Sequence, residues 1–375
     1  MRKILILAGR YLPGYKDGGP VRTLKNLTDI LGTEYDIRIM CIDRDHGDKN
    51  PYPNIKINTY NKVGNAKVYY VKDGKFKTKS ILNEIKKVDV VYCCGPYDNY
   101  AIKTMFLKRI GLFNQNLVVA SMGSFSKGAL SLKSNKKKLF LFFMKKLGFF
   151  KKIIWSVTSN VEERELKEVM GNQAKCIIAE DLPRNKKIKH IHKKKQNHLK
   201  LIFISRICKM KNLLGAIQII SNLTEFPIQF DIYGNIEDKE YWELCKIELE
   251  KLPINVKWQY RGECDSNNVV ETFANYDIFL FPTLGENFGH VISESLLAGC
   301  LPIISNKTSW LDLDDYKCGN VIDLNNRELY VETLKKYALM SSEEFNKYVI
   351  NTQKYISNKN KDSINNTGYK EIFEL

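Results

Sequence analysis

The sequence contains no run of 18 or more apolar residues, about the length that a helix needs to span a bilayer. The apolar run at the amino end, residues 4–8, is too short for a secretory signal and fits the first strand of a parallel sheet better. These two absences predict a cytoplasmic protein without a membrane-spanning segment.

Cysteine pairs with the spacing of a metal site or a disulfide framework are also missing. The nine cysteines are an odd number, and the adjacent Cys93 and Cys94 fit neither spacing. A chain of 375 residues is long enough for two domains and needs no covalent staples. The cysteines therefore fit a reducing cytoplasm.

Histidine is scarce. Three of the five histidines, His190, His192 and His198, lie in one basic segment without a cysteine or carboxylate beside them, so a metal site there is disfavoured. The segment from Arg184 to Lys200 is polar and cationic and has neither helical nor alternating periodicity. We expect a flexible linker between two domains in this segment.

Acidic residues are outnumbered, with 42 Asp and Glu against 59 Lys and Arg, and the net charge of +17 favours anionic partners. The segment from Lys133 to Lys152 holds eight lysines and no acid around an apolar interior, and it predicts a basic amphipathic helix. On a helical projection, one face gathers Leu139, Phe143, Leu147, Phe150 and Ile154, and the opposite face gathers Lys138, Lys145 and Lys152 with Leu141.

Two interpretations of this helix stay open. Each lysine near an anionic bilayer contributes about 1 kcal/mol, so the segment would hold the protein peripherally at the inner face of a membrane. Alternatively, the helix is an ordinary one whose apolar face packs into a core. Nucleic acid is disfavoured as a partner because the basic runs lack interleaved aromatic side chains that face solvent.

Both halves of the chain alternate apolar runs of four to seven residues with longer amphipathic stretches. This pattern is typical of parallel sheets covered by helices on both faces, and it predicts an α/β fold with two Rossmann-like α/β/α domains. We expect the domains at residues 1–184 and 200–357, a linker at 185–199 and a last helix at 358–375. Strands are predicted near Lys3 to Ala8, Asp36 to Cys41, Val88 to Cys93, Leu117 to Ser121, Ile153 to Thr158, Lys200 to Ser205, Gln229 to Tyr233, Val256 to Tyr260, Asp277 to Phe281 and Leu301 to Ser305, and a helix from Arg22 to Leu31.

Two carboxylates eight positions apart, Glu286 and Glu294, directly follow an apolar, strand-like run. The pattern predicts a strand, a loop and a helix, so the amides of Asn287, Phe288 and Gly289 would lie at a helix N-terminus, where anions bind. One carboxylate would then hold sugar hydroxyls and the other a ribose diol. The alternative is that Glu286 caps the helix and Glu294 is a solvated surface residue.

A basic pair, Arg206 and Lys211, follows another apolar run about 80 residues upstream. A bidentate Arg and a point-charge Lys are suited to clamping a diphosphate. Such a pair alone is usually surface decoration. Combined with the two glutamates, it favours a nucleotide-sugar site.

The chain resembles the family 4 retaining glycosyltransferases of the GT-B fold, through Glu286-x7-Glu294, the Arg206 and Lys211 pair, and Asp231-Ile-Tyr-Gly234. Further matching motifs cover nearly the whole length: Tyr11-Leu-Pro-Gly-Tyr-Lys-Asp-Gly-Gly-Pro20, Arg261-Gly262, Tyr276-Asp-Ile-Phe-Leu-Phe-Pro282 and Ala298-Gly-Cys-Leu-Pro302. The resemblance implies two Rossmann-like domains facing each other across a cleft, with the last helix crossing back to the first domain. The second domain would bind the donor and the first the acceptor.

The resemblance also implies roles for single residues. Glu286 would contact the donor sugar and, with Arg206 and Lys211, make up the catalytic set, while Glu294 would contact the ribose. The remaining donor-binding residues would be Asn287, Phe288, Gly289, Gly234 and Arg261. A glycine loop at Gly18 and Gly19 would close over the donor phosphates and the acceptor.

One departure from the family concerns a histidine that many relatives carry in the first domain near the donor sugar. The comparable stretch here, residues 120–129, contains none. The amides and hydroxyls of Ser121, Gly123 and Ser124 are the candidates to replace it as acceptor or sugar ligands.

Two Asp-x-Asp pairs, Asp43-Arg-Asp45 and Asp312-Leu-Asp314, have the spacing of a metal site in the other large glycosyltransferase fold. Such pairs occur often by chance, and the two-domain pattern favours binding of the diphosphate by amides and cations. We therefore expect no obligate metal and no cofactor besides the nucleotide sugar as co-substrate.

The expected function is that of a retaining glycosyltransferase acting on a polysaccharide, a lipopolysaccharide or a lipid-linked oligosaccharide. Frequency in the family favours a uridine-linked donor. A nucleotide-sugar epimerase of related fold stays open as an alternative, although it needs acid/base residues on the sugar that the sequence does not show. A non-catalytic nucleotide-sugar-binding protein also stays open, because of the missing histidine.

Overall fold

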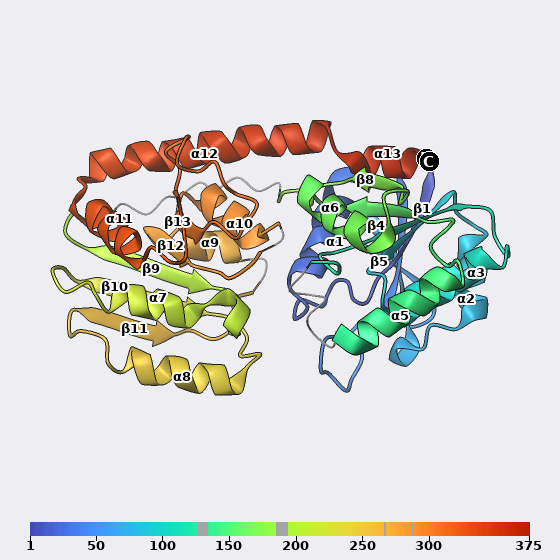
Figure 1. Ribbon diagram of the computed structural model, residues 1–375, viewed down its shortest axis with the longest axis horizontal. Coiled ribbons are helices and arrows are strands. Elements are labelled where there is room, and N and C mark those ends of the chain that lie inside the picture. Colours follow the sequence, from blue (N-terminus) through green and yellow to red (C-terminus); the bar gives the residue numbers. More distant parts are fainter. Residues whose placement is uncertain (127–133, 185–193, 266–267, 287) are drawn as a thin grey trace. The chain divides into compact units, whose positions relative to one another are not determined.

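The computed structural model describes residues 1–126, 134–184, 194–265, 268–286 and 288–375. The chain divides into two compact units, unit 1 formed by residues 1–182 with 363–375, and unit 2 formed by residues 183–362 (Figure 1). Each unit is built on a mainly parallel sheet, which confirms the predicted two-domain α/β fold. Within the described ranges, no helix is long and apolar enough to cross a bilayer.

The sheet of unit 1 has eight strands in the order β3-β4-β2-β1-β5-β6-β7-β8. The strands are β1 Lys3–Leu7, β2 Asp36–Ile42, β3 Tyr60–Val63, β4 Ala66–Val71, β5 Val90–Cys94, β6 Asn116–Ala120, β7 Ile154–Val157 and β8 Cys176–Ile178. Only the pairing of β3 with β4 is antiparallel among these described strands. Strands β2 and β5 lie on opposite sides of β1, so the loops that follow β1 and β5 lie at a switch point, where ligands bind in folds of this kind.

Helices cover both faces of this sheet, which explains its continuous apolar runs. Ile4 and Ile6 of β1 face one core with α1 and α13, while Leu5 and Leu7 face the other with α2, α3, α5 and α6. The helices of unit 1 are α1 Gly19–Leu31, α2 Thr78–Ile85, α3 Asn99–Arg109, α5 Ser134–Lys146, α6 Asn160–Met170 and α13 Gly368–Glu374, with a 3-10 turn at Lys72–Gly74.

The last residues of the chain return to unit 1. In place of the single expected helix at 358–375, the structure has α12 Ser342–Asn365 and then α13, whose N-cap is Thr367. Tyr369 and Phe373 of α13 are buried in the unit 1 core, and Tyr35 donates a 2.8 Å hydrogen bond to Glu374. Unit 1 is therefore built from two separate stretches of sequence.

Unit 2 is built around one core and a six-stranded parallel sheet in the order β11-β10-β9-β12-β13-β14. Its strands are β9 Leu199–Ile204, β10 Ile228–Tyr233, β11 Val256–Tyr260, β12 Ile278–Phe281, β13 Leu301–Ser305 and β14 Asn320–Ile322. Its helices are α7 Leu213–Ile220, α8 Lys239–Leu249, α9 Val269–Phe273, α10 His290–Ala298, α11 Arg327–Leu339 and most of α12, with a 3-10 turn at Lys209–Lys211. Here the switch point lies between β9 and β12.

All ten predicted strands are present, with ends that differ from the predicted ends by at most two residues. The first helix begins at Gly19 instead of Arg22, because Gly18 caps it and Pro20 occupies its first turn. The short edge strands β3, β8 and β14 were not predicted, since they are partly exposed. Strand β4, which is mostly buried, was not predicted either.

The predicted basic helix corresponds to α5, and the face assigned to its apolar side chains is wrong. Leu141, placed with the lysines on the projection, is buried together with Met144 in the core that contains Trp155. Leu139, Phe143 and Leu147 are instead more than half exposed. The helix buries a narrow stripe and leaves a second apolar stripe in water.

Candidate functional site

Two of the predicted catalytic residues meet at the switch point of unit 2. Lys211 ends the 3-10 turn after β9, and Glu286 lies in the loop after β12. Their Nζ and Oε2 atoms are 2.8 Å apart, although 75 positions separate the residues. Lys211 is only 7% exposed and its ammonium group also lies 5.9 Å from the centre of the Phe281 ring. A nearly buried cation at the carboxyl ends of parallel strands is positioned to bind an anion.

Hydrogen bonds between the two loops hold this ion pair in place. Thr283 donates from its hydroxyl to the carbonyl of Met210, 3.1 Å away, and the amide of Leu284 donates to the same carbonyl at 2.9 Å. Asn212 donates from its side chain to the carbonyl of Pro282 at 2.8 Å. The loops after β9 and β12 are therefore joined independently of the ion pair.

Helix α10 begins beside Glu286, as the strand, loop and helix pattern predicted. Its N-cap Gly289 has a φ of +76°, in the left-handed region that favours glycine. A Cβ at Gly289 would lie 3.0 Å from Cγ of Glu286, so the glycine lets the carboxylate side chain approach the helix start. Asn287 lies outside the described residues. Phe288 packs against Trp310, whose indole donates to the Phe288 carbonyl at 2.6 Å.

Glu294 is a buried residue of α10, so its interpretation as a solvated surface group is wrong. It is 1% exposed, and its Oε1 lies 3.4 Å from Nη1 of Arg184. A buried carboxylate needs a cationic or hydrogen-bonding partner, and Arg184 supplies it from the start of unit 2. In the sequence, Arg184 lies at the edge of the expected linker, and no local pattern connects it to a carboxylate 110 positions away.

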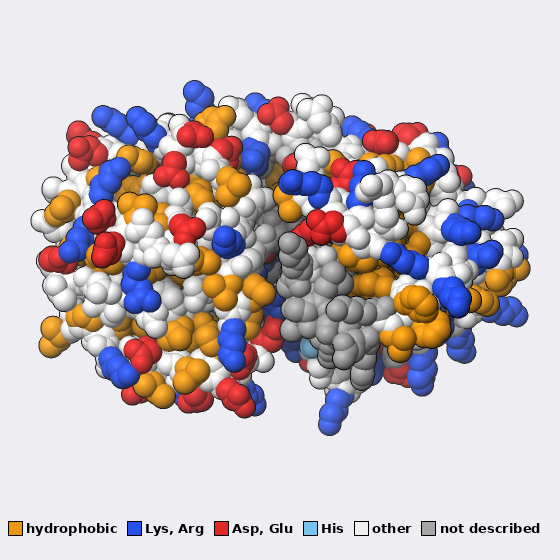
Figure 2. All heavy atoms as spheres, viewed as in Figure 1, with side chains coloured by type: hydrophobic (Ala, Val, Ile, Leu, Met, Phe, Trp, Pro, Cys, Tyr) orange, Lys and Arg blue, Asp and Glu red, His pale blue; other side chains and the backbone are white. Residues whose placement is uncertain are grey.

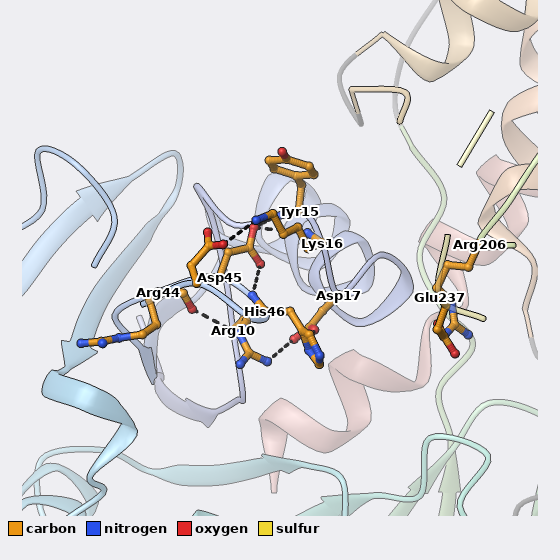
Figure 3. A network of polar contacts seen from close by, with 10 residues as sticks. Arg10, Tyr15, Lys16, Asp17, Arg44, Asp45, His46, Arg206 and Glu237 are labelled. Carbon is orange, nitrogen blue, oxygen red and sulfur yellow. Dashed lines mark hydrogen bonds and ion pairs between the residues drawn. The ribbon is translucent and has the colours of Figure 1, made fainter. Parts of the chain in front are cut away.

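Arg206 does not belong to the Lys211 and Glu286 pair in this structure. Its side chain is half exposed and forms an ion pair with Glu237 (Figure 3). Of the two residues of the predicted clamp, Lys211 is therefore nearly buried at the switch point, whereas Arg206 is half exposed and paired with Glu237.

Gly234 and Arg261 hold the loops after β10 and β11. A Cβ at Gly234 would lie 1.7 Å from the carbonyl oxygen of Ser205, so only glycine fits there, and its amide donates to the carbonyl of Gly262 at 2.8 Å. Arg261 lies 3.3 Å from the buried carboxylate of Asp231. That carboxylate also accepts a 2.6 Å hydrogen bond from Tyr276. Burial, with the Asp231 carboxylate as the next largest cause, raises the pKa of Tyr276 well above its usual value.

In unit 1 the glycine loop is held by two carboxylates. Asp45 accepts hydrogen bonds from the amides of Tyr15 at 2.9 Å and Lys16 at 3.3 Å, and from the amide of His46 at 2.8 Å (Figure 3). Asp17 binds Arg10 at 2.8 Å and lies 2.9 Å from Nδ1 of His46. The chain then turns into α1 through Gly18, whose φ is +64°.

His46 is a residue that the sequence interpretation missed. By position in the resembled family, a histidine is expected in residues 120–129, and none is there. In the structure, His46 contacts Asp17, just before Gly18 and Gly19. The Asp43-Arg-Asp45 motif beside it was considered only as a metal site. In the structure Asp43 pairs with Arg44 and Asp45 binds amides, so both carboxylates have partners within unit 1.

The amides of Ser121, Gly123 and Ser124 are engaged within unit 1. Ser121 donates from both its amide and its hydroxyl to the Ser156 carbonyl, Gly123 donates to the carboxylate of Glu162, and Ser124 donates to the Ser121 carbonyl. A ligand would have to displace these contacts to use the three amides. Across the part of the chain that the structure describes, no cluster of His, Cys, Asp and Glu has the arrangement of a metal site.

The region with the paired glutamates is similar to known proteins. Residues 184–355 match the model of the family described as glycosyl transferases group 1. An uncharacterized 41.2 kDa protein in the cps region of Klebsiella pneumoniae is 22% identical over 264 residues, which are 68% of this chain and 70% of the relative.

Solved structures resemble the whole chain. WaaG, a glycosyltransferase involved in lipopolysaccharide biosynthesis, is similar with a TM-score of 0.64 at 15% identity, over 98% of each chain. HepE of Anabaena, solved in complex with UDP and glucose, is similar with a TM-score of 0.61 at 15% identity, over 96% of this chain and 95% of HepE. At these identities the likeness establishes a shared fold.

Proposed function

We propose that the chain is a retaining glycosyltransferase, because residues 184–355 match the model of the glycosyl transferases group 1 family and the whole chain shares the fold of solved GT-B glycosyltransferases. It would move a sugar from a nucleoside diphosphate to a polysaccharide, a lipopolysaccharide or a lipid-linked oligosaccharide. The observation that carries the proposal is the ion pair of Lys211 and Glu286 at the switch point of unit 2.

In the proposed reaction the bond between the sugar C1 and the diphosphate oxygen breaks, and C1 bonds to the acceptor oxygen on the same face. Negative charge then grows on the departing diphosphate, which takes up the acceptor proton. Lys211 would stabilise that charge from its nearly buried position, where electrostatic interactions are strong because water is scarce. The start of α10 would add backbone N–H dipoles.

The two glutamates would select the donor. Glu286, held by Lys211, would accept hydrogen bonds from the sugar hydroxyls. Glu294, held by Arg184, would accept them from the ribose. Arg206 would join the diphosphate after leaving Glu237, since both side chains of that pair are about half exposed and their mutual attraction is weak.

The identity of the donor and the acceptor draws on the relatives. HepE was solved with UDP and glucose, which favours a uridine-linked donor. WaaG acts in lipopolysaccharide biosynthesis and the Klebsiella relative is in a cps region, which favours a cell-envelope glycan as acceptor. Unit 1, with Gly18, Gly19 and the loop that carries His46, would bind this acceptor. A lipid-linked acceptor would place the enzyme in the cytoplasm at the inner face of a membrane, with Lys133 to Lys152 in contact with it.

The test is release of free nucleoside diphosphate from a panel of UDP-, GDP- and ADP-sugars, with a membrane extract as the acceptor. We expect release from one UDP-sugar, and loss of release in Lys211→Met and in Glu294→Gln. Glu332→Gln on α11 is the matched control for the second variant, because Glu332 is exposed. Donor binding without release from any sugar would instead indicate a nucleotide-sugar-binding protein.

We also propose that the reaction needs no metal. Equal turnover in EDTA and in magnesium is the expected result, and full loss of turnover in the chelator would contradict it. Retention is tested separately by the anomeric configuration of the product, which nuclear magnetic resonance reports directly.

A further inference from the structure

Unit 1 contains a long stretch of sequence without a single acid. Between Asp98 and Glu162 there are twelve Lys and Arg and no Asp or Glu. Unit 1 as a whole has 34 Lys and Arg against 19 Asp and Glu, whereas unit 2 has 25 against 23. Most of the net charge of +17 is therefore on unit 1, and this one stretch supplies the larger part of it.

Helix α5 lies in this stretch and exposes large apolar side chains to water. Leu141 and Met144 fix the helix to the unit 1 core and are 6% exposed each. Large apolar side chains on the helix and just after it also face outward, with Leu139 59%, Phe142 58%, Phe143 51% and Leu147 57% exposed. They recur on successive turns and so form a second stripe on the solvent side of the helix.

The end of α3 extends this stripe. Arg109 donates from Nε to the carbonyl of Leu147 at 3.0 Å, and the rings of Phe106 and Phe149 have centroids 6.2 Å apart. About half of Phe106, Ile110 and Leu112 is also exposed. We call the exposed apolar set the α3–α5 surface: Phe106, Ile110, Leu112, Leu139, Phe142, Phe143 and Leu147.

Cations border this surface. Lys146 at the end of α5 and Lys151 and Lys152 shortly after it are exposed, and Lys108 and Arg109 come from the end of α3. Figure 2 shows hydrophobic side chains gathered over α5 with Lys and Arg next to them. An exposed patch of seven large apolar side chains indicates an interaction site, and the cations around it favour an anionic partner.

We propose that the α3–α5 surface docks on an anionic phospholipid bilayer, with its phenylalanine and leucine side chains inserted among the headgroups and its lysines against the lipid phosphates. A helix that lies in the membrane interface combines these two features, and long lysine side chains reach headgroups while apolar neighbours go deeper. A second copy of the chain fits less well, because two such surfaces would bring like charges together. A nucleic acid would use the lysines and leave the apolar stripe in water.

The test is flotation of the full-length protein with vesicles, one set of phosphatidylcholine alone and one with phosphatidylglycerol added. We expect binding to the anionic vesicles only. Phe142→Gln with Phe143→Gln should weaken this binding at least tenfold, and Lys146→Gln with Lys151→Gln should weaken it several-fold at low salt and less at high salt.

The matched control is Leu244→Gln with Ile247→Gln on α8 of unit 2. These side chains are 52% and 51% exposed, as those of α5 are, but Glu240, Glu243 and Glu248 lie on the same helix. Binding should be unchanged in this control. All variants replace exposed side chains, so an unchanged thermal unfolding midpoint verifies that they fold.

Insertion has a separate readout in Phe143→Trp, whose added fluorescence should be quenched by brominated lipid. Binding that depends on salt but is equal in the phenylalanine double variant would show adsorption by charge alone and would overturn the proposal. So would the absence of binding, or a dimer that the phenylalanine variant splits without any vesicle binding. None of these outcomes depends on the glycosyltransferase activity.

Discussion

In each unit, an aspartate just before a strand binds the backbone of a lysine on the neighbouring strand or next to it, and this aspartate is exposed in unit 1 and buried in unit 2. Asp89 precedes β5 and accepts a 2.8 Å hydrogen bond from the amide of Lys3, and Asp277 precedes β12 and accepts a 2.7 Å bond from the amide of Lys200. Each aspartate also donates its own amide to the carbonyl of the same lysine. Asp89 is exposed, whereas Asp277 is 1% exposed and burial raises its pKa to about 6. The same local contact is therefore exposed in unit 1 and buried in unit 2, and burial raises the pKa of the carboxyl group in unit 2.

Charge follows the same division. Unit 2 is nearly neutral, and two of its ion pairs, Lys211 with Glu286 and Arg184 with Glu294, are largely buried. Unit 1 carries most of the positive charge on its outside. Under the two proposals above, unit 2 would hold a small anionic substrate and unit 1 would meet a large anionic surface.

The largest effect is expected from breaking the inward pair of unit 2. Lys211→Met should lower nucleoside diphosphate release about 10²- to 10³-fold, because one preorganised group that stabilises developing charge is worth that much. Steady-state kinetics with the preferred donor measures it. Lys209→Met is the control, since this lysine lies two residues away in the same 3-10 turn and is exposed. Equal losses in the two variants would contradict the assignment.

The next largest effect is expected from replacing a glycine of unit 2 whose new Cβ would clash with the backbone, compared with a glycine of unit 1 that would only be strained. Gly234→Ala should lower the free energy of unfolding by about 3 kcal/mol, because the new Cβ would collide with the Ser205 carbonyl. Gly18→Ala should cost only about 1 kcal/mol, since Gly18 also has a positive φ but nothing lies within 4 Å of its Cβ position. Urea unfolding measures the free energy of unfolding of both variants, and an equal loss in the two would argue against the clash.

Asp277→Asn should remove a pH dependence that is specific to unit 2. The ordinary pKa of 3.8 rises to about 6 in the fold, so between these values the native state holds a proton that the unfolded chain releases. The free energy of unfolding of the parent should therefore fall by about 2 to 3 kcal/mol as pH rises from 4 to 7, relative to Asp277→Asn. Denaturation curves across this range measure the difference. Asp89→Asn is the exposed control, and a slope that survives Asp277→Asn would sink the prediction.

The smallest effect concerns an exposed pair. Glu237→Gln should change the free energy of unfolding by less than about 1 kcal/mol, because both side chains of the Arg206 and Glu237 pair are about half exposed. If Arg206 serves the diphosphate, the same variant should keep or improve donor affinity, as measured by calorimetry. A large loss of stability would show that the pair supports the fold.

Much of the fold could be predicted because the apolar runs are long and buried on both faces. Such runs in β1, β5, β9 and β12 need no long-range information to be recognised. Strand β3 has only four residues and none of them is buried, so its sequence does not distinguish it from a loop. Strand β4 is mostly buried, and its prediction was missed although its burial alternates. The burial of α5 was misjudged because both of its sides are apolar, and only the neighbouring core decides which side packs.

Local motifs predicted single residues of the candidate site, but not the contacts between residues that are distant in the sequence. The sequence motifs predicted that Lys211 and Glu286 belong to one site, but they predicted Arg206 as the partner of Lys211, and the direct ion pair with Glu286 was not predicted. The partner of Glu294 was not predicted either, since Arg184 is distant in sequence and lies in a basic stretch where one arginine cannot be distinguished from its neighbours. The engagement of the Gly123 amide by Glu162 likewise depends on packing.

The return of residues 363–375 to unit 1 has a consequence for biosynthesis. As the chain is made from its amino end, residues 183–362 of unit 2 are all synthesised before Tyr369, Ile372 and Phe373, which the unit 1 core contains. Domains usually fold in the order of their synthesis. Here the unit that starts first is completed last, so a ribosome that stalls before α13 would leave a finished unit 2 attached to a unit 1 with an open core.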